Sequence, residues 1–259
     1  MPSVLVFDSG LGGLTVRQEI LALMPEVTCH YMMDTARFPY GLQPADRLIE
    51  AIPQILLNAV EAERPDAVVI ACNTASTLAL QHVRAVLDIP VIGTVPAVKP
   101  AAAIAGNRPI AVLGTPLTVK SAYLDQLVSD HAQGIEVLRH GSAELVTMAE
   151  QYFLTGNRPD PAALGKALGP LIDRPDLAAI VLSCTHFPLL KEDIAELLPD
   201  GVQLVDSGAA IARQVQRVIS EAPTDSIAQP QAIATAPVCE SMRQALQHHC
   251  SFENVRVML

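Results

Sequence analysis

Two stretches of the chain share one construction, and that construction constrains the fold more than any other feature. Each begins with a short apolar run, continues through a cysteine and capping residues, and ends in a helical pattern. They are residues 68–86, around Cys72, and residues 178–198, around Cys184. Short apolar, β-branched runs of this kind predict strands that are buried in a parallel sheet. We therefore expect two strand–cysteine–helix units.

Each unit places its thiol at the carboxyl end of a strand and against the start of a helix. Open α/β sheets bind their ligands along this edge. The N-terminus of a helix also favours a thiolate over a thiol. Because the two thiols have equivalent places in two similar units, we expect one site that both units serve.

A second pair of segments extends the repeat. The strand expected at 4–7 runs into a turn containing Ser9, and the strand expected at 110–113 runs into a turn containing Thr115. Ser9 precedes the first motif cysteine by 63 residues, and Thr115 precedes the second by 69. The repeat therefore predicts an α/β fold of two pseudo-symmetric, doubly wound parallel-sheet domains with the active site between them.

A proline-punctuated segment that ends near residue 96 marks the expected crossing between these domains. The first domain is expected to span 1–95 with 206–259 and to carry Asp8 and Cys72. The second is expected to span 96–205 and to carry Cys184 and His186. In the tail we expect a surface loop and then a hairpin that packs on the first domain; the loop spans 220–231, and strands at 231–235 and 255–259 enclose a helix at 240–248.

Composition excludes several function classes. The net charge of −10, with 3% aromatic residues and no Trp, argues against nucleic-acid binding through phosphates or base stacking. No apolar run reaches the ~18 residues of a membrane span, and the first residues lack the basic start of a signal peptide. Five cysteines without a C-x-x-C pair favour reduced thiols and a cytoplasmic protein.

We expect neither a cofactor nor a metal. The glycines at 10, 12 and 13 do not form the G-x-G-x-x-G pattern of a dinucleotide site, because position 15 is Thr. The run His248-His249-Cys250 contains adjacent histidines, whose side chains diverge on a helix, and no second group of ligands accompanies it.

Two thiols that approach one substrate from opposite sides suit the inversion of a carbon centre. One thiolate removes the α-proton, and the opposite thiol returns a proton to the other face of the planar carbanion. Since an amino-acid α-proton is weakly acidic and no electron sink is expected, hydrogen-bond donors must stabilise the carbanion. Asn73, Thr74, Thr185 and backbone N–H groups at the two helix starts are the candidates.

Five segments, taken together, resemble the signature segments of the bacterial glutamate racemase family, in order and over essentially the whole chain. They are Phe7-Asp8-Ser9-Gly10, Asp34-Thr35-Ala36-Arg37-Phe38-Pro39-Tyr40-Gly41, Ala71-Cys72-Asn73-Thr74-Ala75-Ser76, Cys184-Thr185-His186-Phe187-Pro188-Leu189-Leu190 and Val205-Asp206-Ser207-Gly208. The resemblance implies a cofactor-independent isomerase that interconverts L- and D-glutamate with two bases and supplies D-glutamate for peptidoglycan, in two pseudo-symmetric α/β domains.

The same resemblance assigns residue roles. It implies that Cys72 and Cys184 are the acid/base thiols, that Asp8 and His186 assist them, and that Glu150 lies near His186. It implies that substrate is bound by Asp8, Ser9, Tyr40, Gly41, Asn73, Thr74, Thr185 and His186. The expected partners are a small-molecule substrate and, as an assembly, a homodimer.

The sequence departs from the family at Ser183, where many members have Gly, and we expect this change to affect strand packing. Some enteric relatives carry an N-terminal extension associated with activation by a peptidoglycan precursor; this sequence starts at its first strand, so we do not expect that regulation. Three rival functions stay open. They are an aspartate or hydantoin racemase of the same fold, a binding protein that inhibits DNA gyrase in addition to catalysis, and a hydrolase that uses Cys184 and His186.

Overall fold

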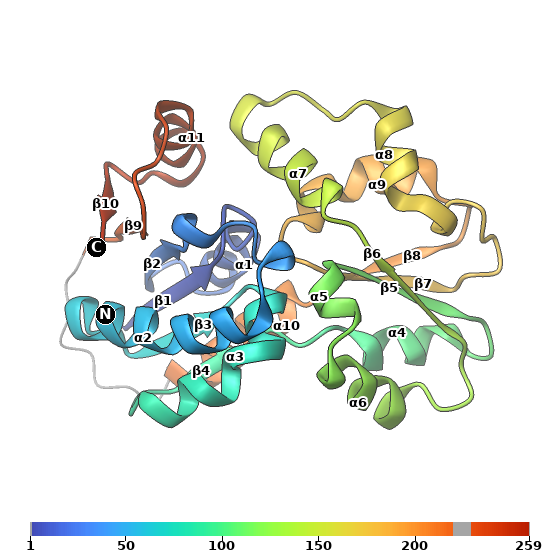
Figure 1. The fold of residues 1–259 in the computed structure, drawn as a ribbon, viewed down its shortest axis with the longest axis horizontal. Helices are drawn as coiled ribbons and strands as arrows, with labels where there is room; N and C mark the ends of the chain where they lie inside the picture. The colour runs from blue at the N-terminus through green and yellow to red at the C-terminus, as the bar shows by residue number, and fades with distance from the viewer. Residues whose placement is uncertain (1, 220–228, 259) are drawn as a thin grey trace. The chain divides into compact units, whose positions relative to one another are not determined.

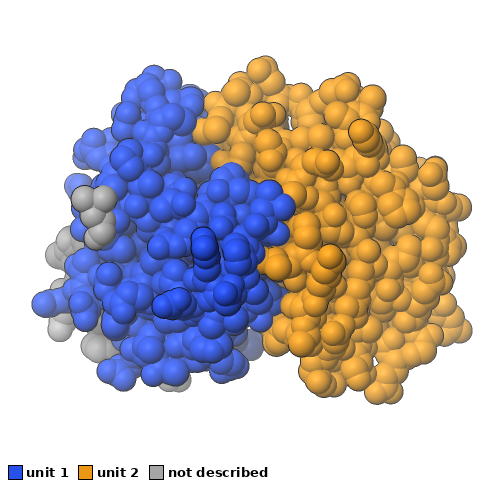
Figure 2. All heavy atoms as spheres, in the orientation of Figure 1, with its two compact units in different colours: residues 1–94, 208–259 blue, residues 95–207 orange. Residues whose placement is uncertain are grey.

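The computed structural model describes residues 2–219 and 229–258. Contacts between Cα atoms divide the chain into two compact units, which Figure 2 shows in blue and orange. Unit 1 comprises residues 1–94 and 208–259, and unit 2 comprises residues 95–207. Most of the surface loop expected at 220–231 lies outside the described residues.

Unit 1 is built on a parallel sheet. Its elements are β1 (Ser3–Asp8), α1 (Leu14–Leu23), β2 (Thr28–Met33), α2 (Ala45–Glu63), β3 (Ala67–Ile70), α3 (Asn73–Val86), β4 (Val91–Gly93), α10 (Gly208–Ile219), β9 (Ala232–Ala234), α11 (Glu240–Cys250) and β10 (Val255–Val257). The strand order is β10-β9-β2-β1-β3-β4, and every pair is parallel. On one face α1 packs against α10, and on the other α2 packs against α3 (Figure 1). Because helices cover both faces, β1, β2 and β3 are buried along their whole length.

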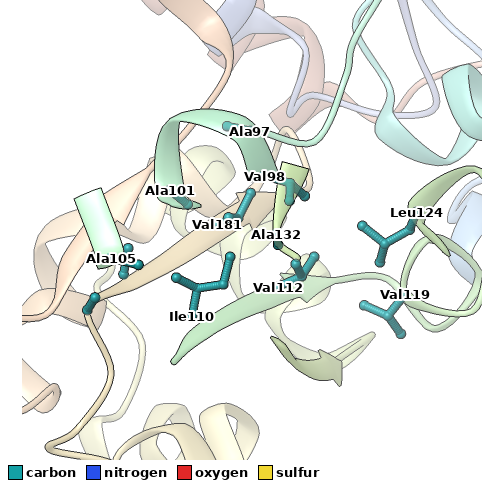
Figure 3. Close-up of a cluster of buried hydrophobic side chains, with 12 residues drawn as sticks. Ala97, Val98, Ala101, Ala105, Ile110, Val112, Val119, Leu124, Ala132 and Val181 are labelled. Carbon is teal, nitrogen blue, oxygen red and sulfur yellow. The ribbon is translucent and has the colours of Figure 1, made fainter. Parts of the chain in front are cut away.

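Unit 2 has a smaller parallel sheet. Its elements are α4 (Val98–Ala105), β5 (Ile110–Gly114), α5 (Pro116–Val119), α6 (Ala122–His131), β6 (Val137–Gly141), α7 (Glu144–Thr155), α8 (Pro161–Leu168), β7 (Ala179–Ser183), α9 (Lys191–Leu197) and β8 (Gln203–Val205). The strand order is β6-β5-β7-β8, again with every pair parallel. Helix α4 lies over one face of this sheet, where Val98 and Ala101 pack toward Ile110 and Val181 (Figure 3).

The two sheets repeat one topology. In unit 1 the order β2-β1-β3-β4 places the switch point, where the direction of strand succession reverses, between β1 and β3; in unit 2 it lies between β5 and β7. Doubly wound sheets bind ligands beyond the carboxyl ends of the strands at such a point. The predicted α/β class with two parallel, doubly wound sheets is confirmed.

The predicted hairpin in the tail is wrong. Strands β9 and β10 pair in parallel, with Val255 opposite Ala232 and Val257 opposite Ala234. A hairpin requires antiparallel strands, but α11 crosses over between these two and returns the chain to the same end of the sheet. Strand β9 extends the sheet next to β2, as expected of a tail that packs on the first half (Figure 1).

The sequence pattern at residues 98–105 predicts no regular element, but the structure has α4 there. Among the described helices, none has both the length and the apolar character that crossing a bilayer demands.

Candidate active site

In unit 1 the switch point brings together two segments that are far apart in sequence. Asp8 is the last residue of β1 and Ser9 follows it, while Cys72 lies two residues beyond the end of β3. The Cys72 Sγ atom lies 3.9 Å from the Ser9 Oγ atom. Asp8, Ser9 and Cys72 are all buried. The predicted pairing of a loop with a thiol is therefore present in the folded chain.

The carboxyl group of Asp8 is held inside the turn that it begins. Its Oδ1 atom accepts a hydrogen bond from the Gly10 N–H at 2.9 Å. Helix α1 approaches this turn so closely that a Cβ atom on Gly13 would lie 2.7 Å from the Asp8 Cβ atom. Only glycine fits at that position without displacing the backbone, so the turn geometry fixes the carboxyl group beside the thiol segment.

The helix after Cys72 begins earlier than predicted. Asn73 and Thr74 are the first residues of α3 and not caps before it, while Cys72 has the extended N-cap conformation. The turn from β3 into α3 takes only two residues, which leaves no room for separate capping residues. As a result the buried Asn73 Oδ1 atom accepts no hydrogen bond from the described residues. A buried acceptor of this kind requires a donor, and a bound molecule can supply it.

The loop after β2 contributes Tyr40 and Gly41, both of which are buried. The Tyr40 hydroxyl donates to the Asp34 Oδ2 atom at 2.6 Å. Burial is the main cause that raises the pKa of Tyr40 well above its ordinary value, and the charges of Asp34 and Cys72 raise it further. Tyr40 is therefore a neutral phenol near pH 7. A phenol that stays protonated cannot act as a general base.

In unit 2 Cys184 directly follows β7, next to the switch point of that sheet. The predicted α-helix after it is replaced at first by a 3-10 turn, Phe187–Leu190, and α9 begins only at Lys191. Pro188 lies in the first positions of this turn, where its fixed φ angle is favourable. Because the turn is short, a helix dipole contributes less at Cys184 than at Cys72.

The side chain beside Cys184 is an imidazole. The Cys184 Sγ atom lies 3.7 Å from the His186 Nδ1 atom, and the Thr185 Oγ1 atom lies 3.5 Å from the same nitrogen. Cys184 and His186 are two residues apart in sequence, a spacing that does not by itself place a thiol next to an imidazole. The turn after β7 brings the two side chains together.

Glu150 reaches the same imidazole from α7. Its Oε1 atom lies 2.9 Å from the His186 Nε2 atom, and both side chains are buried. Burial alone lowers the pKa of His186, but hydrogen bonds with Cys184 and Glu150 outweigh it and hold this pKa well above its ordinary value. The imidazolium carries a hydrogen on both nitrogens, so Nε2 donates to Glu150 and Nδ1 faces the sulfur as a donor.

The predicted site residues form two groups, one in each unit. The Cys72 half-site, in unit 1, consists of Asp8, Ser9, Tyr40, Gly41, Cys72, Asn73 and Thr74. The Cys184 half-site, in unit 2, consists of Glu150, Cys184, Thr185 and His186. Within the described residues no set of three or more His, Cys, Asp and Glu side chains is arranged to hold a metal ion.

Two polar residues of the first half-site were not predicted. Asp34 is fully buried and binds Tyr40, and Thr235 at the end of β9 binds Asp34. Asp34 had a signal, since it ends a strand at the same edge of the sheet as Asp8. Thr235 had none, because the tail was assigned to a hairpin.

Comparisons with known proteins agree with this geometry. A model of the Asp/Glu/Hydantoin racemase family matches residues 15–215. A glutamate racemase of Vibrio cholerae is 48% identical over 84% of this chain and 81% of its own length, and one of Shewanella sp. (strain MR-7) is 44% identical over 88% and 84%. The chain therefore belongs to the Asp/Glu/Hydantoin racemase family.

Solved structures narrow the assignment within that family. The structure of Escherichia coli glutamate racemase in complex with L-glutamate and the activator UDP-MurNAc-ala matches with a TM-score of 0.93, at 38% identity, over 99% of this chain and 98% of that one. Glutamate racemase of Francisella tularensis in complex with D-glutamate matches with a TM-score of 0.82 at 26% identity, over 100% and 97%. The chain is thus an amino-acid racemase, an isomerase whose relatives are glutamate racemases.

Proposed function

We propose that this protein interconverts L- and D-glutamate by a two-thiol mechanism that needs no cofactor. The observation that carries the proposal is the repeated placement of a buried cysteine, Cys72 and Cys184, at the switch point of each sheet. The choice of glutamate is supported by the 38% identical E. coli enzyme, which binds L-glutamate.

The proposed reaction is a pair of proton transfers at one carbon. The thiolate of one cysteine takes the α-proton and becomes a thiol, which leaves a planar carbanion. The thiol of the other cysteine then gives its proton to the opposite face and becomes a thiolate. The substrate is inverted, and the two sulfur atoms have exchanged protonation states. The mechanism requires that both half-sites reach the same substrate molecule.

The carbanion is the difficult intermediate, and hydrogen bonds have to stabilise it. We assign Thr74 and Thr185, with the backbone N–H groups at the start of α3, to the negative carboxylate and carbanion side of the substrate. The unsatisfied Asn73 Oδ1 atom can only accept, so we assign it to the α-ammonium group. Ser9 and Gly41 complete the predicted binding surface on the Cys72 side.

Two ionisable groups assist the thiols in this proposal. Asp8 acts on the Cys72 side, where it is fixed within the turn after β1. His186 acts on the Cys184 side as a donor to the sulfur, and Glu150 orients its ring and keeps it protonated. The rival hydrolase reading of Cys184 and His186 is not retained, because family membership identifies a racemase.

We further propose that the D-glutamate serves peptidoglycan synthesis, the role implied by the family resemblance. The cytoplasmic location, the homodimer and any gyrase-inhibiting role stay predictions.

Solvent deuterium incorporation at Cα tests the two-thiol mechanism. We would start separately from L- and D-glutamate with wild type, Cys72→Ser and Cys184→Ser. Wild type is expected to label the product enantiomer from either direction. Each variant is expected to lose racemisation, with any remaining exchange restricted to one starting enantiomer. Normal racemisation by both variants would refute the mechanism.

Circular dichroism of the substrate tests the assignment to glutamate. L-glutamate, L-aspartate and a hydantoin would each be incubated with wild type. The loss of the circular-dichroism signal of the substrate would be followed. Inversion of aspartate or of the hydantoin, with no turnover of glutamate, would keep the fold and the family but reject the substrate.

A further inference from the structure

The two residues just after β9, Thr235 and Ala236, contact the loop that carries Tyr40. The Thr35 Oγ1 atom donates to the Ala236 carbonyl oxygen at 3.1 Å, and the Ala236 N–H donates back to Thr35 Oγ1 at 3.0 Å. The Thr235 N–H donates to the Met33 carbonyl oxygen at 3.1 Å. A segment more than 190 residues away in sequence therefore fixes the loop that begins at Asp34.

The hydroxyl of Thr235 has a defined direction in this contact. It accepts the Ala36 N–H at 3.1 Å and lies 2.5 Å from the Asp34 Oδ1 atom. A carboxylate can only accept, so the single hydroxyl proton of Thr235 is directed at Asp34.

Asp34 passes this constraint on to Tyr40. Its Oδ1 atom accepts a hydrogen bond from the Thr235 hydroxyl, and its Oδ2 atom accepts one from the Tyr40 hydroxyl at 2.6 Å. The half-exposed Arg37 donates to both oxygens, at 3.1 and 3.3 Å. The single proton of the Tyr40 hydroxyl is thereby committed to Asp34. For any other partner this hydroxyl offers only acceptor lone pairs.

Tyr40 lies where an oriented hydroxyl group can contact a bound substrate. Tyr40 is buried, and the 3-10 turn Tyr40–Leu42 packs against α3, the helix that begins directly after Cys72. An oxygen that can only accept, next to the thiol, matches the N–H donors of an α-ammonium group. The neighbouring Asn73 Oδ1 atom is a second acceptor of the same kind.

We propose that Thr235 and Asp34 are positioning residues that hold the Tyr40 hydroxyl as an acceptor for the α-ammonium group of the substrate. The segment just after β9 then contributes a side chain to the Cys72 half-site. This inference rests on the proposed function, because it names the substrate group that the same site recognises.

The test compares Thr235→Val, which keeps the shape of the side chain but removes the hydroxyl, with Thr235→Ser, which keeps the hydroxyl. In Thr235→Val the KM for L-glutamate is expected to rise about tenfold, with a smaller change in kcat, as for the loss of a hydrogen bond to a charged group. Thr235→Ser is expected to restore KM. Thr28→Val, which alters a buried threonine at the opposite end of β2, serves as the control and should leave KM unchanged.

A double-mutant cycle decides whether Thr235 acts through Tyr40. Tyr40→Phe removes the oriented hydroxyl, so adding Thr235→Val to it should raise KM by less than about twofold further. If the two single effects on KM multiply in the double variant, Thr235 does not act through Tyr40 and the proposal is overturned. An unchanged KM in Thr235→Val would also overturn it, because a merely structural contact lowers the folded fraction without changing KM.

Urea unfolding of wild type, Thr235→Val, Tyr40→Phe and the double variant separates this inference from the proposed function. If wild type does not turn over glutamate, the proposed function fails, but the coupling of Thr235 and Tyr40 in unfolding midpoints is still measurable. Non-additive midpoints support the relay through Asp34 whatever the substrate. Additive midpoints refute it.

Discussion

The two cysteines have equivalent places in their sheets but different neighbours. Cys72 lies beside the hydroxyl of Ser9, in a turn that also holds the carboxyl group of Asp8. Cys184 lies beside the imidazole of His186, which a carboxyl group from a distant helix keeps protonated. The repeated topology places the thiols, while side chains that differ between the two halves set the chemistry beside each one. A racemase that works in both directions can therefore have two unlike halves.

The largest difference between the halves should appear when each neighbour is removed. His186→Asn is expected to lower kcat about 100-fold, the lower range for a group that assists proton transfer. Ser9→Ala is expected to lower kcat by less than about tenfold, because a hydroxyl 3.9 Å from the sulfur is a weak partner. Initial rates from both enantiomers provide the measurement. Equal losses would show that the two neighbours contribute alike.

Glu150→Gln tests the carboxyl group that contacts His186 in unit 2 and has no counterpart beside Cys72. We expect a loss of about tenfold in kcat at neutral pH, the size expected for losing a hydrogen bond between charged groups. The variant also loses one of the interactions that raise the pKa of His186, so the alkaline limb of the pH–rate profile should move to lower pH. Glu144→Gln, at the exposed start of the same helix, is the control. An unmoved limb would disconnect Glu150 from the titration of His186.

His186, in unit 2, should also make the free energy of unfolding depend on pH. Since the folded pKa of His186 is raised, its stabilising contribution is fully present below the unfolded value of about 6.5 and is lost as the pH rises through the folded pKa. Within that window the free energy of unfolding should fall by up to about 1.4 kcal/mol per pH unit. Urea unfolding of wild type and His186→Asn between pH 6 and 9 measures it. The slope from this residue should be missing in the variant.

The smallest expected effect concerns the residue before each cysteine, which is Ala71 in unit 1 and Ser183 in unit 2. The Ser183 Oγ atom is fully buried and has no hydrogen-bond partner in the described residues. Ser183→Ala should therefore stabilise the protein by about 1 kcal/mol, because it removes an unsatisfied polar group. The reverse change, Ala71→Ser, should destabilise it. A lower unfolding midpoint in Ser183→Ala would mean that this hydroxyl is satisfied.

The sequence predicted the parts of the fold that long, strongly patterned segments specify. The apolar runs before Cys72 and Cys184 are strands β3 and β7, and the parallel sheets follow from the alternation of strands with helices. The patterned segment at 45–63 forms α2, with Pro53 inside it. In these segments, local pattern and tertiary packing favour the same structure.

The errors fall where several local conformations have similar free energies. Strands β9 and β10 have three residues each, so their direction is set by the α11 crossover and by pairing with β2, which no local pattern shows. The start of α4 includes Pro100, and its alanine-rich run becomes a helix by packing on β5 and β7. The contact of Glu150 with His186 joins residues 36 apart and was implied only by the family resemblance.

Unit 1 is assembled from two separated parts of the chain, and this has a consequence for synthesis on the ribosome. All of unit 2 is translated before α10, β9 and β10 appear. Until then the outer edge of β2 has no neighbour, and a free strand edge invites pairing with other chains. Unit 2 has all its strands by residue 205 and is able to fold as it emerges, while unit 1 must wait for residues 208–259, the last fifth of the chain. Translation that stops before residue 232 therefore leaves an exposed strand edge next to the loop that carries Tyr40.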